Sequence, residues 1–245
     1  MQSRTVFLLY NRSPAISLTA QFFEEKKKRP FSEPYKFNKR DMKISMALRT
    51  AKKALRLQLK QKLKSMSDAD KHRQSQLVTT KLFQNKRYLN SQRISVYLSR
   101  DIEVDTRPIL ENIFSSGKEC FIPRYDSKST HMVMLKLKSL EEYEKMPLTT
   151  WNIKQPDAED DDRENALLTG GLDLIIVPGI GFTKEGHRIG NGKGYYDVYI
   201  KKCQEILGTK VSTIALAFQE QIVPYIPTDE HDMMIDEVLY PEEAV

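Results

Sequence analysis

The 245-residue chain has 40% hydrophobic and 29% charged residues, which excludes wholesale disorder and is typical of a globular protein. No apolar run reaches the roughly 18 residues of a membrane-spanning helix, so we expect no association with a membrane. The two cysteines, Cys120 and Cys203, cannot build a disulfide framework and favour a reducing compartment.

The net charge of +6 lies in the first 45 residues, which hold ten Lys/Arg and four Asp/Glu. The rest of the chain has 29 residues of each sign, which argues against nucleic acid as a partner. Residues 1–23 contain Arg4, Arg12 and several Ser/Thr but no acidic residue, a composition typical of a mitochondrial transit peptide. A disordered tail, or translated sequence ahead of a second start at Met46, fits the same composition. We therefore predict a disordered or targeting extension over residues 1–45 and a single domain over 46–245.

The first predicted element is a helix beginning near Met46. Its apolar residues recur every three or four positions, at Leu48, Ala51, Leu55, Leu59, Leu63 and Met66. Basic residues follow an i, i+4 spacing on another face, at Lys52, Arg56, Lys60 and Lys64. Ser67, with Asp70 three residues later, predicts the capped start of a second helix that ends near Phe83.

Short apolar strands then alternate with helices. Strands are predicted over residues 94–98, 119–123, 132–137, 172–177 and 211–218, and helices over 106–116 and 195–207. The acidic run over residues 157–164 has no apolar partners and is predicted to be a solvated loop. This alternation predicts a three-layer α/β/α fold, Rossmann-like, around a mostly parallel central sheet.

Eight of the ten glycines fall between Gly170 and Gly194. Gly190, Gly192 and Gly194 precede the helix that starts at Tyr195, and alternating glycines let consecutive backbone N–H groups converge on an anion. The N-terminus of that helix adds its positive dipole end. With Arg188 and Lys193 nearby, the segment predicts a phosphate-binding loop, the alternative being a plain glycine-rich connection.

Two familiar phosphate-binding motifs do not fit this spacing. A Walker A loop would need a glycine where His187 stands and Ser or Thr where Gly194 stands. The Rossmann fingerprint would need a small residue at Tyr195 or Asp197.

Carboxylates near such a loop suggest magnesium, because Mg²⁺ takes one or two protein carboxylates and completes its shell with phosphate and water. Asp197 and Asp232 are the candidates. His187 and His231 have no Cys or His cluster around them, so zinc is not expected.

At this stretch the sequence resembles the 5-formyltetrahydrofolate cyclo-ligase family. The resemblance rests on ordered motifs over residues 46–240, of which the longest is Gly186-x-Arg188-x-Gly190-x-Gly192-Lys193-Gly194-Tyr195-Tyr196-Asp197. Others are Lys52-x-x-x-Arg56, Arg93-Ile-Ser-x-Tyr-Leu98-Ser, Cys120-Phe-Ile-Pro-Arg-Tyr125, Thr150-Trp151-Asn-Ile-x-Gln155-Pro156 and Asp232-Met-x-x-Asp236. The motifs look closest to those of the animal enzymes.

The resemblance implies ATP- and Mg²⁺-dependent conversion of 5-formyltetrahydrofolate, and of its polyglutamates, to 5,10-methenyltetrahydrofolate with release of ADP and phosphate. It further implies a cytoplasmic monomer, or a mitochondrial protein if residues 1–45 are a transit peptide. Phosphorylation of the formyl oxygen turns a poor leaving group into a good one, so the protein's task is positioning and charge neutralisation.

Site residues carry over from the resemblance by position. It implies catalytic roles for Arg188 and Lys193 and metal ligation by Asp197 and Asp232. ATP would contact Lys52, Arg56, Arg188, Gly190, Asn191, Gly192, Lys193, Gly194, Tyr195 and Tyr196. The folate would contact Leu98, Glu103, Trp151, Tyr195 and Tyr196. Asn191 departs from the arginine expected in animal relatives, which puts a direct contact from that side chain to phosphate in doubt.

Simpler interpretations of these residues remain open. Lys52 and Arg56 fit the solvated face of an amphipathic helix, Trp151 fits a core position and Glu103 an exposed strand end. At the level of function, an isomerase or transferase of the sugar-phosphate isomerase and CoA-transferase architecture, or a non-catalytic nucleotide- or folate-binding module, remain as alternatives.

Overall fold

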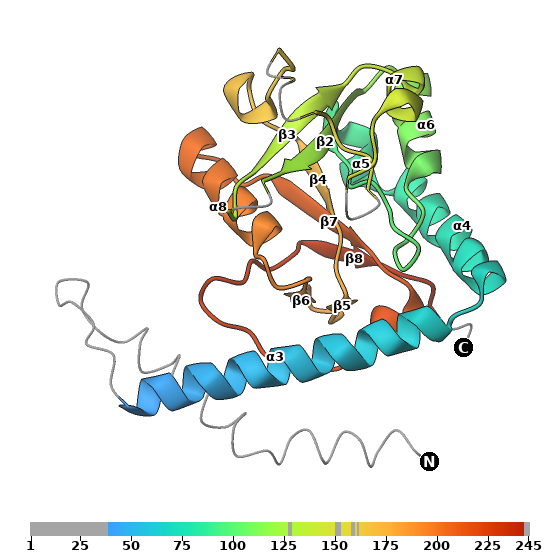
Figure 1. Cartoon of the computed structure of the whole chain (residues 1–245). Coiled ribbons are helices and arrows are strands. Elements are labelled where there is room, and N and C mark those ends of the chain that lie inside the picture. Colours follow the sequence, from blue (N-terminus) through green and yellow to red (C-terminus); the bar gives the residue numbers. More distant parts are fainter. Residues whose placement is uncertain (1–38, 127–128, 150–152, 158–159, 161, 243–245) are drawn as a thin grey trace.

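The computed structural model describes residues 39–126, 129–149, 153–157, 160 and 162–242, and the following concerns those residues (Figure 1). The strands are β1 (Arg93–Ser95), β2 (Glu119–Tyr125), β3 (Met132–Leu137), β4 (Leu174–Val177), β5 (Gly181–Phe182), β6 (Arg188–Ile189), β7 (Ser212–Leu216) and β8 (Glu237–Leu239). The α-helices are α3 (Lys39–Ser65), α4 (Asp68–Gln84), α5 (Lys86–Asn90), α6 (Arg107–Ser115), α7 (Leu140–Lys145) and α8 (Tyr195–Leu207). Two 3₁₀ turns, η1 (Ala166–Leu168) and η2 (Gln219–Gln221), complete the elements.

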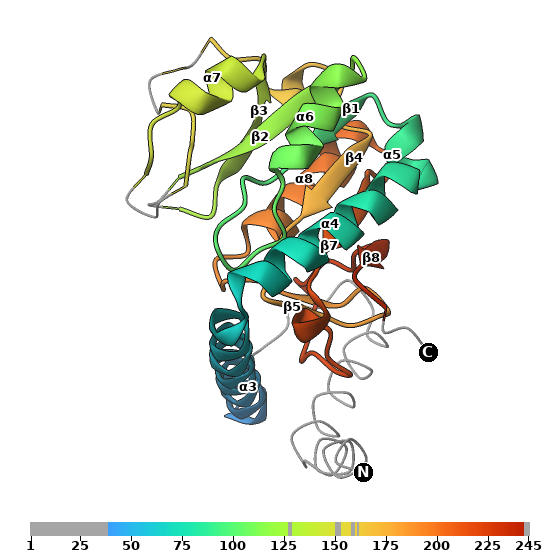
Figure 2. The same cartoon turned by 90° about the vertical axis from the view of Figure 1, so that its right-hand side faces the viewer.

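A six-stranded sheet in the order β3-β2-β1-β4-β7-β8 forms the centre of the fold. All neighbouring strands are parallel except β3, which is antiparallel to β2. Helix α8 lies on one face and helices α4, α5 and α6 on the other, as Figures 1 and 2 show. The predicted three-layer fold with a mostly parallel sheet is therefore confirmed.

The order of the parallel strands contains a topological switch point. From β1 the chain moves outward to β2 and β3, then returns to place β4 on the other side of β1. The segments after β1 and β4 therefore diverge, and in open α/β sheets such a divergence leaves a crevice at the carboxyl ends of the two strands. Tyr97 to Arg100 follow β1 at this edge, and Pro178 and Gly179 follow β4.

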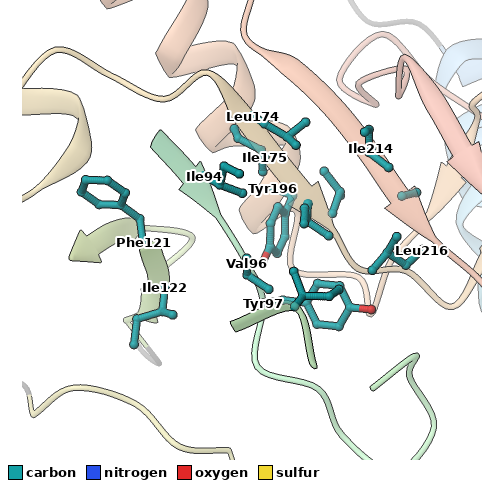
Figure 3. Close-up of a cluster of buried hydrophobic side chains, with 14 of the residues drawn as sticks. Ile94, Val96, Tyr97, Phe121, Ile122, Leu174, Ile175, Tyr196, Ile214 and Leu216 are labelled. Carbon is teal, nitrogen blue, oxygen red and sulfur yellow. The ribbon is translucent and has the colours of Figure 1, made fainter. Parts of the chain in front are cut away.

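The interior between the layers is apolar and continuous. Strand β4 is buried along its whole length, as expected for a parallel strand covered on both faces. Side chains of β1, β2, β4 and β7 meet there, and Tyr196 from α8 lies among them (Figure 3). Tyr196 and Tyr97 are thus part of the core while they also reach the sheet edge.

Helix α3 runs across this edge and packs on the short hairpin β5–β6 rather than on the sheet (Figure 1). Leu55 and Leu59 form a small cluster with Ile180 and Ile189 of the hairpin and Ile226. A Cβ on Gly181 would lie 2.5 Å from Leu59 Cδ1, so any larger residue there would force the Leu59 side chain to shift.

Several predicted details differ from the structure. Helix α3 begins at Lys39, so the predicted boundary at Met46 falls inside it, and Ala51 is exposed although the stripe predicted it to be buried. Strands β1, β4 and β7 are shorter than predicted: β1 ends at Ser95, β4 begins at Leu174, and β7 spans only Ser212–Leu216. The acidic run is not wholly solvated, since Glu164 accepts hydrogen bonds from Arg93 and Lys136.

Candidate functional site

A cavity of about 870 Å³ opens at the switch point, between α3, the loops after β1 and β4, and the start of α8. It is large enough for a nucleotide or a pterin and lies where ligands bind in this class of fold. Among the predicted site residues, the following line it: Lys52, Arg56, Leu98, Glu103, Arg188, Gly190, Asn191, Gly192, Lys193, Gly194, Tyr195, Tyr196, Asp197 and Asp232. Trp151 lies outside the described residues.

The glycine-rich loop forms one wall of the cavity. Gly192 and Gly194 have φ values of +103° and +73°, which only glycine adopts readily, and Gly194 caps α8. The backbone N–H groups of residues 191–194 donate no hydrogen bond to the described part of the chain. Free amides next to a helix N-terminus are suited to binding an anion, so this geometry is compatible with the predicted phosphate-binding loop.

Gly190 is needed for a different reason from the one expected. Its φ is not positive; instead a Cβ there would lie 2.7 Å from Nη1 of Arg188. The Arg188 guanidinium is buried and held by two partners, the carbonyl of Pro178 at 3.2 Å and Asp197 Oδ2 at 2.6 Å. The Arg188 side chain is therefore held in one position, where it packs against Gly190 of the glycine-rich loop.

Asp197 is engaged on both carboxylate oxygens. Besides the ion pair with Arg188, its Oδ1 accepts a hydrogen bond of 3.0 Å from the backbone N–H of Met233. This bond brings the segment that contains Asp232 next to the first turn of α8. The two carboxylates proposed from the sequence as metal ligands therefore lie on adjoining segments of one cavity.

Lys52 and Arg56 face the cavity from α3. Nζ of Lys52 donates to Asp229 Oδ2 at 2.8 Å and to Asp232 Oδ2 at 2.5 Å. Burial alone would raise the pKa of Asp229, but the Lys52 hydrogen bond and charge outweigh burial and hold that pKa below its usual value. Nε of Arg56 donates to the carbonyl of Gly190 at 2.8 Å, and burial lowers the pKa of its guanidinium.

The loop after β1 also contributes to the cavity wall. Glu103, only 7% exposed, is bonded by Arg100 through both carboxylate oxygens, at 2.6 and 3.3 Å. Leu98 and two tyrosines, Tyr125 and Tyr196, line the cavity as well. The tyrosine hydroxyls lie 3.5 Å apart, and burial is the main cause that raises the pKa of Tyr125 to about 12.

Tyr195 stacks at a tilt on Tyr125, with ring centroids 5.0 Å apart, and its hydroxyl donates to the carbonyl of Asp126. The two tyrosines of the motif thus differ: Tyr195 is partly exposed, and Tyr196 is 4% exposed. The exposed side chain of Asn191 lines the cavity as well, so the departure from arginine lies within the site.

Cations outnumber carboxylates in the cavity. The cationic side chains are Arg49, Lys52, Arg56, Lys60, Arg100, Arg188 and Lys193, and the carboxylates are Glu103, Asp197, Asp229 and Asp232. Three cations are paired with these four carboxylates. Arg49, Arg56, Lys60 and Lys193 have no ion-pair partner within 4.0 Å among the described residues. Such an excess favours ligands that carry several negative charges.

Comparison with known proteins is consistent with this geometry. The model of the 5-formyltetrahydrofolate cyclo-ligase family matches residues 49–241. The chain belongs to this family. Of the curated relatives, the mouse 5-formyltetrahydrofolate cyclo-ligase is 53% identical over 196 residues, which is 80% of this chain and 96% of the mouse protein. A Caenorhabditis elegans protein described as a probable 5-formyltetrahydrofolate cyclo-ligase is 35% identical, with 81% of this chain and 97% of that protein covered.

A solved structure supports the cyclo-ligase fold. The 5,10-methenyltetrahydrofolate synthetase of Mycoplasma pneumoniae superposes with a TM-score of 0.59 at 21% identity, covering 78% of this chain and 99% of that chain. Within the described residues, no helix combines the length and apolar character that crossing a bilayer requires.

Sequence reasoning missed several residues that line the cavity. Asp229 shares Lys52 with Asp232, and its position three residues earlier in the same acidic stretch could have indicated it. Arg100 directly follows the motif that begins at Arg93, and Tyr125 ends the motif that begins at Cys120, but neither was assigned a role in the site, to which the fold brings both. Asp236 lies elsewhere and accepts hydrogen bonds from Thr213.

The donor set suits magnesium. In the described part of the chain no cluster of three or more His, Cys, Asp or Glu could hold a metal by itself. Mg²⁺ bound with a nucleotide needs only one or two carboxylates, since phosphate oxygens and water supply the rest. Oδ1 of Asp232 has no hydrogen-bond partner among the described residues, which leaves a carboxylate oxygen free at the cavity wall.

Proposed function

We propose that this cyclo-ligase converts 5-formyltetrahydrofolate to 5,10-methenyltetrahydrofolate while ATP is converted to ADP and phosphate. The observation that carries the proposal is the cavity at the switch point, whose wall combines free backbone amides and unpaired cations with tyrosines and a buried carboxylate. The amides and cations suit a polyphosphate, and the tyrosines and carboxylate suit a planar heterocycle with hydrogen-bond donors. Family membership supports the same assignment.

The reaction proceeds by phosphoryl transfer to the substrate. The formyl oxygen attacks the γ-phosphorus of ATP, and ADP leaves with the electron pair of the broken P–O bond. N10 of the folate then attacks the formyl carbon and loses its proton. Inorganic phosphate departs with the former formyl oxygen, which leaves the five-membered methenyl ring.

The residues of the cavity divide this task. The amides of residues 191–194, Lys193 and Arg56 bind the phosphates and offset charge on the transferring group. Arg188 positions other residues of the site, because its guanidinium is bonded to Asp197 and packs against Gly190. Glu103, held by Arg100, accepts hydrogen bonds from the donors of the pterin. Tyr125, Tyr195 and Tyr196 supply the aromatic surface.

Asp197 and Asp232 are the residues that would hold Mg²⁺, with Asp229 beside them. The ion would offset phosphate charge next to the leaving ADP. Lys52 now pairs with Asp229 and Asp232, so it holds these carboxylates at the cavity wall in the free protein.

The purified protein, given ATP, Mg²⁺ and 5-formyltetrahydrofolate, should produce the near-ultraviolet absorbance of the methenyl product together with one ADP per product formed. Isomerisation of a pentose phosphate without ATP would instead favour the isomerase-like alternative. ATP binding without ADP release would indicate a non-catalytic binding module. Both results contradict the proposal.

We further propose that the protein is a cytoplasmic monomer that also accepts polyglutamate forms of the substrate. Its location is tested with fluorescent fusions of the full chain and of a chain that starts at Lys39, which keeps α3 complete. A mitochondrial signal that appears with the full chain but not with the shorter chain would show that the extension is a transit peptide. It would overturn the cytoplasmic assignment.

A further inference from the structure

Each of the two carboxylates assigned to the metal already pairs with a basic side chain. Asp197 Oδ2 accepts a hydrogen bond of 2.6 Å from Arg188, and Asp232 Oδ2 accepts one of 2.5 Å from Lys52. Asp229 accepts a second hydrogen bond from Lys52, at 2.8 Å, so the ammonium bridges two carboxylates. A divalent cation that approaches Asp232 therefore meets the positive charge of Lys52 beside it.

The two basic residues differ in how firmly they are held. The Arg188 side chain is buried, and its guanidinium also donates to the carbonyl of Pro178. The Lys52 ammonium donates two of its three N–H groups to Asp229 and Asp232, and the third has no hydrogen-bond partner in the described part of the chain. Lysine carries its charge on a flexible four-carbon stem, so Lys52 is the cation that can change partners.

A polyphosphate bound at the glycine-rich loop would lie close to Lys52. Lys52 precedes Arg56 by one helical turn, which puts their Cα atoms about 6 Å apart on α3. Arg56 donates to the carbonyl of Gly190 at 2.8 Å, and residues 191–194, with their free amides, line the same cavity as Lys52. A polyphosphate carries more negative charge than one carboxylate, so it attracts the ammonium away from Asp232.

We propose that Lys52 is an internal counter-ion that weakens the binding of a divalent cation at Asp232 until a polyphosphate takes up its ammonium. Asp229, the second acceptor of Lys52, holds the ammonium at Asp232 in the meantime. The inference rests on the proposed function and adds to it an order of binding, in which the metal ion enters with the nucleotide and not before it. Metal and polyphosphate then favour each other's binding through the same lysine.

The first test measures Mn²⁺ alone by electron paramagnetic resonance, without nucleotide. Lys52→Met removes the charge, and Lys53→Met is the control, the same change at the adjacent exposed position outside the cavity. Lys52→Met should bind Mn²⁺ about tenfold more tightly than the wild type, whereas Lys53→Met and the charge-retaining Lys52→Arg should bind it as weakly as the wild type. Equal affinities of the wild type and Lys52→Met, or an equal gain in Lys53→Met, overturn the proposal.

The second test measures ATP alone by calorimetry in the presence of EDTA. Lys52→Met should bind metal-free ATP about tenfold more weakly than the wild type, and Lys53→Met should bind it equally well. A merely structural role of Lys52 would weaken both ligands, so only opposite shifts for Mn²⁺ and ATP support the proposal. Circular dichroism checks folding, and Lys52→Ala takes the place of Lys52→Met if that variant is unfolded.

Neither measurement needs turnover, which separates this inference from the proposed function. Opposite shifts in a protein that forms no methenyl product would support the role of Lys52 and contradict only the proposed reaction. Unshifted affinities in a protein that forms the product would overturn only the role of Lys52.

Discussion

At the residue scale, the site depends on one buried contact between an arginine and a glycine. Arg188 is 8% exposed and is fixed by Asp197 and the carbonyl of Pro178. Its guanidinium occupies the space that a side chain at Gly190 would need. The loop and the carboxylate of Asp197 are therefore positioned by the same cation.

Gly190→Ala tests this contact without adding backbone strain, because the φ of Gly190 is not in the left-handed region. The added methyl must displace the guanidinium, so kcat/KM for ATP should fall about tenfold, which corresponds to about 1.4 kcal/mol. Gly117→Ala is the control: its φ is +69° and nothing lies within 4 Å of the new methyl, so it should lower stability by about 1 kcal/mol and leave kinetics unchanged. Unaltered kinetics in Gly190→Ala would contradict the positioning role.

Asp197→Ala should affect folding as well as catalysis. Removing one partner of a buried ion pair leaves Arg188 charged and uncompensated, so the free energy of unfolding should fall by about 3 kcal/mol. Urea titration measures this loss, and activity at rising Mg²⁺ measures any loss of metal use. Glu205→Ala, at an exposed pair on the same helix, should cost less than about 0.5 kcal/mol. Similar losses in both variants would show that Asp197 has no special structural role.

At the element scale, α3 and the β5–β6 hairpin act as one unit that carries the basic residues to the cavity. The helix contacts the hairpin through Leu55 and Leu59, and its basic face then meets the glycine-rich loop at Arg56. Disturbing the apolar contact between α3 and the hairpin should therefore also disturb the contact of Arg56 with the glycine-rich loop.

Leu59→Ala removes a side chain that is 3% exposed and should cost about 2.5 kcal/mol of stability, since it leaves a cavity against Gly181. KM for ATP should rise in the same variant because Arg56 and Lys52 lose their fixed position. Leu57→Ala, 61% exposed on the same helix, is the matched control and should change neither quantity. A stable Leu59→Ala protein would contradict the packing role of α3.

A second element-scale feature is the ion-pair network that joins β1, β2 and β3 at the far edge of the sheet from the cavity. Glu164 accepts hydrogen bonds mainly from Lys136 and also from Thr169 and Arg93, and these bonds lower the pKa of Glu164 to about 2. Because the folded pKa is below the unfolded value of about 4.3, the stabilisation is complete above pH 4.3 and is lost as pH falls towards 2. Glu164→Gln should therefore lose less stability than the wild type across this range in urea titrations. Glu141→Gln, an exposed carboxyl on α7, should behave as the wild type.

At the scale of the whole molecule, the sheet topology collects charges that are distant in sequence. Lys52, Arg100, Lys193 and Asp232 come from four segments and meet at one edge because the segments that follow β1 and β4 diverge there. In the proposed function, this excess of cations would attract the polyanionic nucleotide before it makes any specific contact.

Raising the ionic strength from about 0.05 to about 0.3 M shortens the Debye length from about 14 to about 6 Å. We expect kcat/KM for ATP to fall about three- to tenfold over this range, with a smaller change in kcat. Lys193→Gln should show a weaker salt dependence than the wild type. A salt-independent kcat/KM would show that the cavity charge does not guide binding.

The sequence by itself determined the local elements and the chemistry of the loop. Ser67 caps α4 through the N–H of Asp70 as predicted, and α8 spans Tyr195–Leu207 as predicted, because caps and periodicity are local properties of the chain. Gly192 and Gly194 adopt positive φ for the same reason. The family motifs further indicated fourteen of the residues that line the cavity.

Only the tertiary structure decided which charges meet and which of them are already paired. No spacing in the sequence shows that Arg188 is buried against Gly190, that Lys52 bridges Asp229 and Asp232, or that Arg100 grips Glu103 while Lys60 stays unpaired. Short elements such as β5, β6 and β8 were missed because two or three residues carry no periodicity. These features depend on packing around the switch point between residues that are far apart in the chain. A short stretch of sequence holds only one side of each such contact, so it cannot predict them.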